Sequence, residues 1–171
     1  MPNYDDRVFT GGELGKVSAV VASLPAGYVL GEERYENGVV FRLVYNAGNS
    51  QISTGFLGSP IPLSGGAYSL TVSTASKTNA HGGAAVCHHA TATTGTYFWG
   101  AVRGYLASGL VADAVTLATG SAFYVGVNGQ VNGITVNSTN VSANVPIGVV
   151  INGPTAGTIA VRQASVLLQI S

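Results

Sequence analysis

The segment HGGAAVCHH, residues 81–89, contains all three histidines and the only cysteine of the chain. Imidazole and thiolate groups are side chains that bind zinc and that serve as bases and nucleophiles in catalysis. Two kinds of chemistry therefore have to be weighed at this segment. One is a metal site, and the other is a cysteine–histidine pair that attacks an electrophilic substrate.

The spacing of these residues argues against a metal site. A structural zinc ion usually has four ligands, often in two close pairs. Cys87, His88 and His89 are adjacent, and His81 lies six residues before the cysteine. Neighbouring side chains of an extended strand point to opposite faces, so His88 would point away from the other two. At most three ligands could converge, and we expect no metal and no cofactor. A cluster formed by several copies at a symmetry axis stays open.

Catalysis at the same segment lacks an orienting acid. Cys87 and His89 would share one face of a strand, but Asp113 is the only carboxylate after residue 36. Glycosidases need two carboxylates, and the hydrolase-elbow and phosphate-loop patterns are absent from the sequence. We therefore predict that the chain is not an enzyme. The segment is expected to be a strand or loop in which Cys87 behaves as a small apolar residue.

The composition narrows the class of protein further. Only 8% of the 171 residues are charged, the formal net charge is zero, and 24 residues are glycine; an average soluble protein has about 25% charged residues. Without a basic run, nucleic acid is not an expected partner. The mean hydropathy is +0.35, but no apolar run approaches the roughly 20 residues that span a bilayer, so no membrane partner is expected. A surface so poor in charge is either rich in small polar residues or covered by partners.

The charges divide the chain into two parts. Residues 1–36 carry six acidic and three basic residues, and residues 37–171 carry one acidic and four basic residues. We predict that 1–36 form a partly extended N-terminal arm and that 37–171 form a β-rich body. Within the arm, residues 12–24 have weak helical spacing, which Pro25 and Gly27 would end.

Short β-type runs separated by turn residues follow the arm. They predict strands at 38–46, 67–74 and 96–106, a hairpin at 121–136 and closing strands within 146–170. Asn128-Gly129 favours a two-residue type I′ turn in the hairpin, and Gly100 and Gly104 indicate a bulge or a close backbone approach. The predicted fold is all-β, a compact β-sandwich or β-barrel domain with an N-terminal extended arm.

Aromatic and cationic side chains in the 96–106 run are the other candidates for binding. Tyr97, Phe98 and Trp99 could form a sugar-binding platform or an interface anchor, although glycines flank them as in a core strand, which is the interpretation we favour. Arg103 lies further along the same run, and Arg42 and Arg162 lie in other β-type runs. An arginine in so apolar a domain either extends its head group to solvent or pairs with a partner's acid.

Three segments together resemble a known family. They are RYENGVVFRLVYNAGNSQISTG at 34–55, ATATTGTYFWGAVRGYLASGLVADAVTLATGSAFYVGVNGQV at 90–131, and IGVVINGP with GTIAVRQASVLLQI within 147–170. In these segments the chain resembles the small capsid decoration, or cement, proteins of tailed bacteriophages. The resemblance covers roughly residues 34–170. It implies a β-rich domain on the outside of a phage head, often trimeric, that bridges neighbouring major capsid subunits.

The resemblance and the composition lead to one functional expectation. The protein would be a structural component of the virion, made in the host cytoplasm, that binds the major capsid protein and forms a homo-oligomer, in our prediction a trimer. The expected interface residues are Tyr4, Arg7 and Phe9 in the arm and Tyr97, Trp99 and Arg103 in the body. Two alternatives remain: a carbohydrate- or receptor-binding β-sandwich of a virion with Trp99 and Tyr97 as its platform, and a metal-dependent enzyme that uses the histidines.

Overall fold

The described part of the chain is built from strands and turns and is all-β, as the sequence predicts. The computed structural model describes residues 14–62, 68–74, 86–112, 119–120, 122–125, 129, 131–133, 148–152 and 162–169. The strands are β1 (Val20–Val21), β2 (Glu33–Glu36), β3 (Val39–Asn46), β4 (Leu57–Pro62), β5 (Tyr68–Thr74), β6 (Val86–His88), β7 (Tyr97–Ala112), β8 (Ala122–Val125), β9 (Val131–Gly133), β10 (Gly148–Asn152) and β11 (Arg162–Gln169). Within these ranges no helix has the length and apolar character needed to cross a bilayer.

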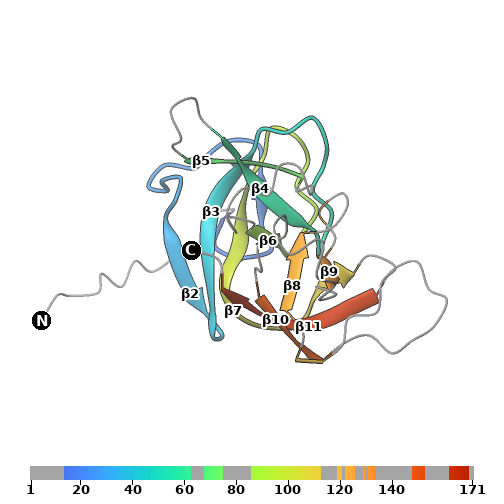
Figure 1. The fold of residues 1–171 in the computed structure, drawn as a ribbon. Coiled ribbons are helices and arrows are strands. Elements are labelled where there is room, and N and C mark those ends of the chain that lie inside the picture. Colours follow the sequence, from blue (N-terminus) through green and yellow to red (C-terminus); the bar gives the residue numbers. More distant parts are fainter. Residues whose placement is uncertain are drawn as a thin grey trace, which may run out of the picture.

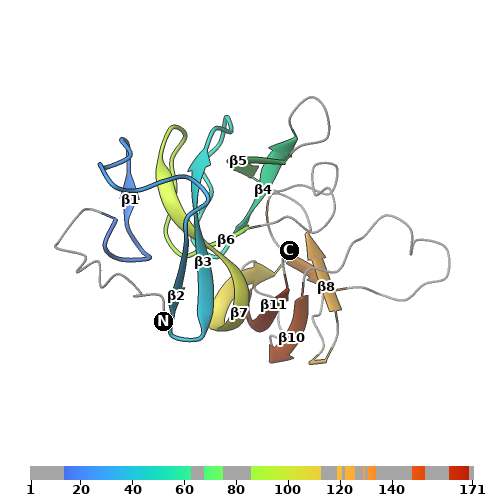
Figure 2. The same ribbon diagram turned by 90° about the vertical axis from the view of Figure 1, so that its left-hand side faces the viewer.

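The strand pairings close into two rings that share β7. In the first ring, β7 pairs with β6, β6 with β4, β4 with β5, and β5 returns through a short parallel contact to β3, which pairs with β7. In the second, β7 pairs with β11, followed by β10, β8 and β9, and β9 returns to β7 in parallel. Figure 2 shows β7 curving from the group that contains β3 into the group that contains β8, β10 and β11. The fold is therefore a pair of small barrels joined along one strand.

Strand β7 serves both rings because it is long and because it bends. It has 16 residues, about three times an average strand. The register against β3 shifts by one residue between Ala101 and Arg103, which is a β-bulge at Val102, and a bulge increases the local twist of a strand. Gly104 follows with φ of 115°. A Cβ built on it would lie 2.4 Å from the carbonyl oxygen of Gly38. The predicted bulge and close backbone approach are both confirmed.

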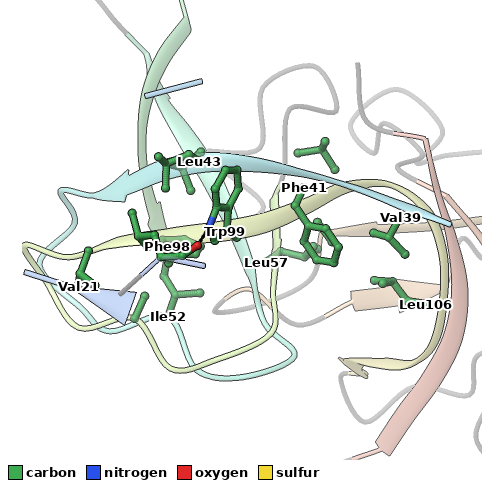
Figure 3. Packing of buried hydrophobic residues seen from close by; sticks show 14 of the residues in the cluster. Val21, Val39, Phe41, Leu43, Ile52, Leu57, Phe98, Trp99 and Leu106 are labelled. Carbon is green, nitrogen blue, oxygen red and sulfur yellow. Dashed lines mark hydrogen bonds between the residues drawn. The ribbon is translucent and has the colours of Figure 1, made fainter. Parts of the chain in front are cut away.

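The hydrophobic core lies along the shared strand and its neighbours. Strand β3 buries Val39, Phe41 and Leu43 on one face and Val44 on the other, whereas Tyr45 is only partly buried. Figure 3 shows the first three of these side chains meeting Phe98, Trp99 and Leu106. The fully buried Phe123 of β8 belongs to the same cluster, so the core includes side chains from both rings.

Residues 14–36 belong to the body, which corrects the arm boundary expected at residue 36. Leu14 has no exposed surface, β1 pairs with the start of β7, and β2 pairs with β3 along its full length. In Figure 1, β2 lies beside β3 at one edge of the sheet. The weak helical spacing at 12–24 is not realised in 14–24, which holds turns and β1. Residues 1–13 lie outside the described residues.

The C-terminal strands form as expected, with one error at the hairpin. Strands β8 and β9 are antiparallel, but Val125 pairs with Val131, so residues 126–130 connect them and the two-residue turn at Asn128-Gly129 is wrong. Gly129 instead packs against the first ring: a Cβ placed on it would lie 2.6 Å from the Leu57 carbonyl oxygen.

Substituting Gly104 by alanine tests whether the shared strand depends on the close approach to Gly38. We expect the free energy of unfolding to fall by about 2–4 kcal/mol, because positive φ strains an alanine and its Cβ overlaps the Gly38 backbone. Urea unfolding followed by circular dichroism measures the change. The matched control is Gly27→Ala, where φ is 92° but a Cβ would have no heavy atom within 4 Å beyond the neighbouring residues. Equal losses in the two variants would show that the contact with Gly38 contributes nothing.

Candidate binding surface

The histidine-rich segment forms the short strand β6 and the bend after it. Through their backbones, Cys87 pairs with Ala101 of β7 and with Leu57 of β4, and His88 pairs with Gly100. In the part of the chain that the structure describes, no three His, Cys, Asp or Glu residues are grouped closely enough to hold a metal ion. His81 and Asp113 lie outside the described residues.

His89 is partly buried beside an aromatic ring. Its imidazole meets Phe41 edge to face, with the two ring centroids 5.5 Å apart. The Nε2 atom is buried and has no hydrogen-bond partner. Burial lowers the pKa of His89 below its usual value of 6.5, because a charged imidazolium would lose its hydration there. His89 is therefore a neutral packing residue in the folded protein.

Trp99 is a core residue, which agrees with the core strand favoured from the sequence and corrects the alternative assignment of Trp99 to a platform or an interface. Its side chain has no exposed surface. The indole Nε1 donates a hydrogen bond of 3.0 Å to the Leu14 carbonyl, Tyr28 meets the ring edge to face, and the Arg34 guanidinium carbon lies 5.9 Å from the ring centroid. All three partners come from the first 36 residues. Trp99 anchors its own chain's N-terminal segment, and a glycan has no access to it.

Arg34 completes this anchor. One guanidinium nitrogen donates to the Gly15 carbonyl at 2.8 Å, and the other forms an ion pair of 2.6 Å with Glu36. Tyr97, the other body aromatic singled out from the sequence, is half-buried and packs against Tyr45 with ring centroids 4.7 Å apart. These contacts place the aromatic part of the expected interface mainly inside the protein.

The outward side of strands β2, β3 and β7 carries a different set of residues, which we name the arginine–tyrosine face. Its members are Glu33, Tyr35, Val40, Arg42, Arg103 and Tyr105. Tyr35 pairs with Val40, which pairs with Arg103, and cross-strand partners lie on the same side of a sheet. Tyr35 is 75% exposed and Tyr105 is 49% exposed. Of the body residues expected at an interface, Arg103 is the one at this surface.

The charges of the arginine–tyrosine face are unequal in number. The Glu33 Oε1 atom accepts hydrogen bonds from two nitrogens of Arg42, at 2.7 and 3.1 Å. The Glu33 Oε2 atom lies 4.0 Å from the Arg103 guanidinium. One carboxylate thus serves two arginines. Tyrosine and arginine are enriched at the centres of protein interfaces, so this surface has the chemistry of a contact site for another protein.

Sequence reasoning missed Tyr35, Tyr105 and Glu33. The alternation of glutamate with arginine and tyrosine in ERYE, residues 33–36, was the available signal. Assigning these residues to an arm hid it, because alternation indicates two faces only in a strand. Tyr4, Arg7 and Phe9, expected at the interface, lie outside the described residues.

No family model matches the chain, and the searches of curated proteins and of solved structures likewise found no match.

Replacing Trp99 by phenylalanine tests its role as an internal anchor. We expect the free energy of unfolding to fall by about 2–4 kcal/mol, because a buried carbonyl loses its donor and a cavity remains. Thermal and urea unfolding measure the loss. Tyr35→Ala is the matched control at an exposed aromatic, with an expected change within about 0.5 kcal/mol. A Trp99 variant as stable as the parent would contradict the anchor.

The stability of the protein is expected to depend on His89 at mildly acidic pH. The folded-state pKa of His89 lies below the unfolded value of about 6.5, so the unfolded chain binds more protons between the two values. The free energy of unfolding should therefore fall as the pH drops below about 6.5 and level off below the folded pKa. Urea unfolding of the parent and of His89→Phe across this range isolates the contribution. Identical pH profiles would be inconsistent with a buried neutral imidazole.

Proposed function

We propose that this protein is a capsid decoration protein that binds the outside of a phage head and bridges neighbouring major capsid subunits. The arginine–tyrosine face is the observation that supports this most directly. It includes the edge strand β2 of the sheet and combines two exposed tyrosines with an arginine whose charge is only partly balanced. Such a surface suits contact with another protein better than the enclosure of a small molecule.

The composition supports the same proposal. Only 8% of the residues are charged, far below the 25–35% typical of the surface of an independent soluble domain. Exposed apolar side chains, including Val29 and Ile151, add to the area that gains from being covered. A trimer would cover part of this area by closed symmetry, with the capsid covering more.

The segments that carry the resemblance to decoration proteins fold into strands of both rings. They include β3, all of β7, which the rings share, and β8 and β11. Strands β3 and β7 supply many of the core residues and also carry Arg42 and Arg103 of the arginine–tyrosine face. The resemblance therefore covers both the core strands and part of the proposed binding surface.

A carbohydrate-binding role is the second candidate. Burial of Trp99 removes the platform expected from the sequence. Tyr35 and Tyr105 retain some capacity for stacking on a sugar, because both side chains are exposed. We favour a protein-binding role over a sugar-binding role because the two tyrosines accompany arginines that pair with Glu33 across three strands, and arginine and tyrosine together are enriched at protein interfaces.

Antibody labelling of purified particles tests the proposal. An antibody against the full-length protein, detected by gold in electron microscopy, is expected to label the head surface at regular positions. Particles assembled without the protein provide the control. Label confined to tail fibres would favour the receptor-binding alternative, and unlabelled particles would contradict a role in the virion.

A further inference from the structure

The positive charge of Arg103 in the arginine–tyrosine face is only partly balanced. The Arg103 side chain is 59% exposed, and its ion pair with Glu33 is long at 4.0 Å, whereas Arg42 holds the same carboxylate at 2.7 Å. A guanidinium has five donors, so Arg103 can accommodate a further carboxylate. Tyr35 lies on the side of the sheet that carries Arg103, and Tyr105 follows Arg103 by two residues in β7 and is 49% exposed. The backbones of β2 and β7 are about 10 Å apart because each strand spacing is about 4.8 Å. The face therefore fits an extended segment that carries both acidic and aromatic side chains.

The acidic residues of the chain indicate where such a segment is found. Among the described acids, Glu33 and Glu36 pair with arginines, and Glu32 accepts a hydrogen bond from the Val29 backbone. The remaining acids are Asp5, Asp6, Glu13 and Asp113. Three of these four fall within residues 1–13, which also contain Tyr4, Phe9 and one arginine, Arg7, so that acidic residues outnumber basic ones there. The segment that precedes the folded body thus has the composition that the face would recognise.

The anchor at Trp99 fixes where this segment leaves the body. Trp99 holds Leu14 and Arg34 holds Gly15. Arg34 and Tyr35 are consecutive residues of β2, so they point to opposite sides of the sheet. The segment therefore starts on the side of the sheet away from the arginine–tyrosine face of its own chain. Thirteen extended residues reach at most about 45 Å, and a domain of this length has a radius of gyration of about 16 Å. A neighbouring molecule is within range.

We propose that the arginine–tyrosine face binds residues 1–13 of a second copy of this chain, with the aspartates at Arg103 and the aromatic residues beside Tyr35 and Tyr105. The inference rests on the proposed function, in which several copies assemble on one head. The exchange of segments links each copy to the next, and Arg103 is the residue whose pairing is completed by the partner copy.

Charge reversal in the full-length protein tests this exchange. The segment variant carries Asp5→Arg and Asp6→Arg, and the face variant carries Arg103→Glu. Each variant alone places like charges together, so we expect its self-association to weaken at least about tenfold in sedimentation experiments at micromolar concentration. In an equimolar mixture, the basic segment of one variant meets the acidic face of the other. The mixture should therefore associate although neither component does.

The controls separate charge effects from folding. Lys16→Glu reverses an exposed charge away from the face and should leave association unchanged. Tyr35→Ala weakens association without placing a second acid beside Glu33. Circular dichroism and thermal unfolding of each variant confirm that it is folded, which is expected because the substituted face residues are exposed.

Three results would overturn the proposal. The parent protein could remain a monomer at micromolar concentration, or the charge reversals could leave self-association unchanged. The third result is that the mixture fails to associate and that a chain carrying all three substitutions is a folded monomer, which would mean that the segment binds the face of its own chain. None of these measurements requires phage heads. Labelling of heads by the parent protein is scored separately, so loss of the exchange and loss of the proposed function are distinguishable.

Discussion

The structure depends on a single strand that is hydrogen-bonded into both rings. Strand β7 pairs with β3 and β6 over its first half and with β11 over its second half. The transition lies at the bulge and at Gly104, whose backbone contacts that of Gly38. A side chain at this position would separate β7 from β3, and the two barrels would lose their common wall. The residues that surround the bend therefore determine both the core and the alignment of the outward face.

The same strand joins the interior of the protein to its surface. Trp99 points into the core and holds the N-terminal segment through Leu14, while Arg103, four residues later, lies on the outward side beside Glu33. The bulge at Val102 allows both orientations within one short stretch. A residue inserted or deleted there would reverse the side occupied by every residue beyond it. The bulge therefore explains why the arginine–tyrosine face and the contacts that hold the N-terminal segment lie on opposite sides of the same sheet.

Much of the fold could be predicted from the sequence, and less of the surface. The β-type residues of 38–46 and the turn residues around them predicted β3 correctly, because the local pattern and the pairing agree there. The listing of Trp99 among interface residues, beside the favoured core-strand interpretation, has a different origin: an aromatic beside glycines has the same local pattern whether it meets a partner or its own N-terminal segment. Burial of Leu14 and pairing of β2 depend on contacts between residues far apart in the chain, such as Leu14 with Trp99, which no local pattern records. The mistaken arm at 14–36 then concealed Tyr35.

The central claim is that one outward face of a shared strand carries assembly, while the opposite face holds the molecule together. Hydrogen exchange of the full-length protein, free and bound to heads, tests this claim most directly. The account predicts that amides of β3 and β7 are strongly protected in both states, and that binding adds protection at residues 1–13 and along β2. New protection confined to β8, β10 and β11, with β2 unchanged, would contradict it.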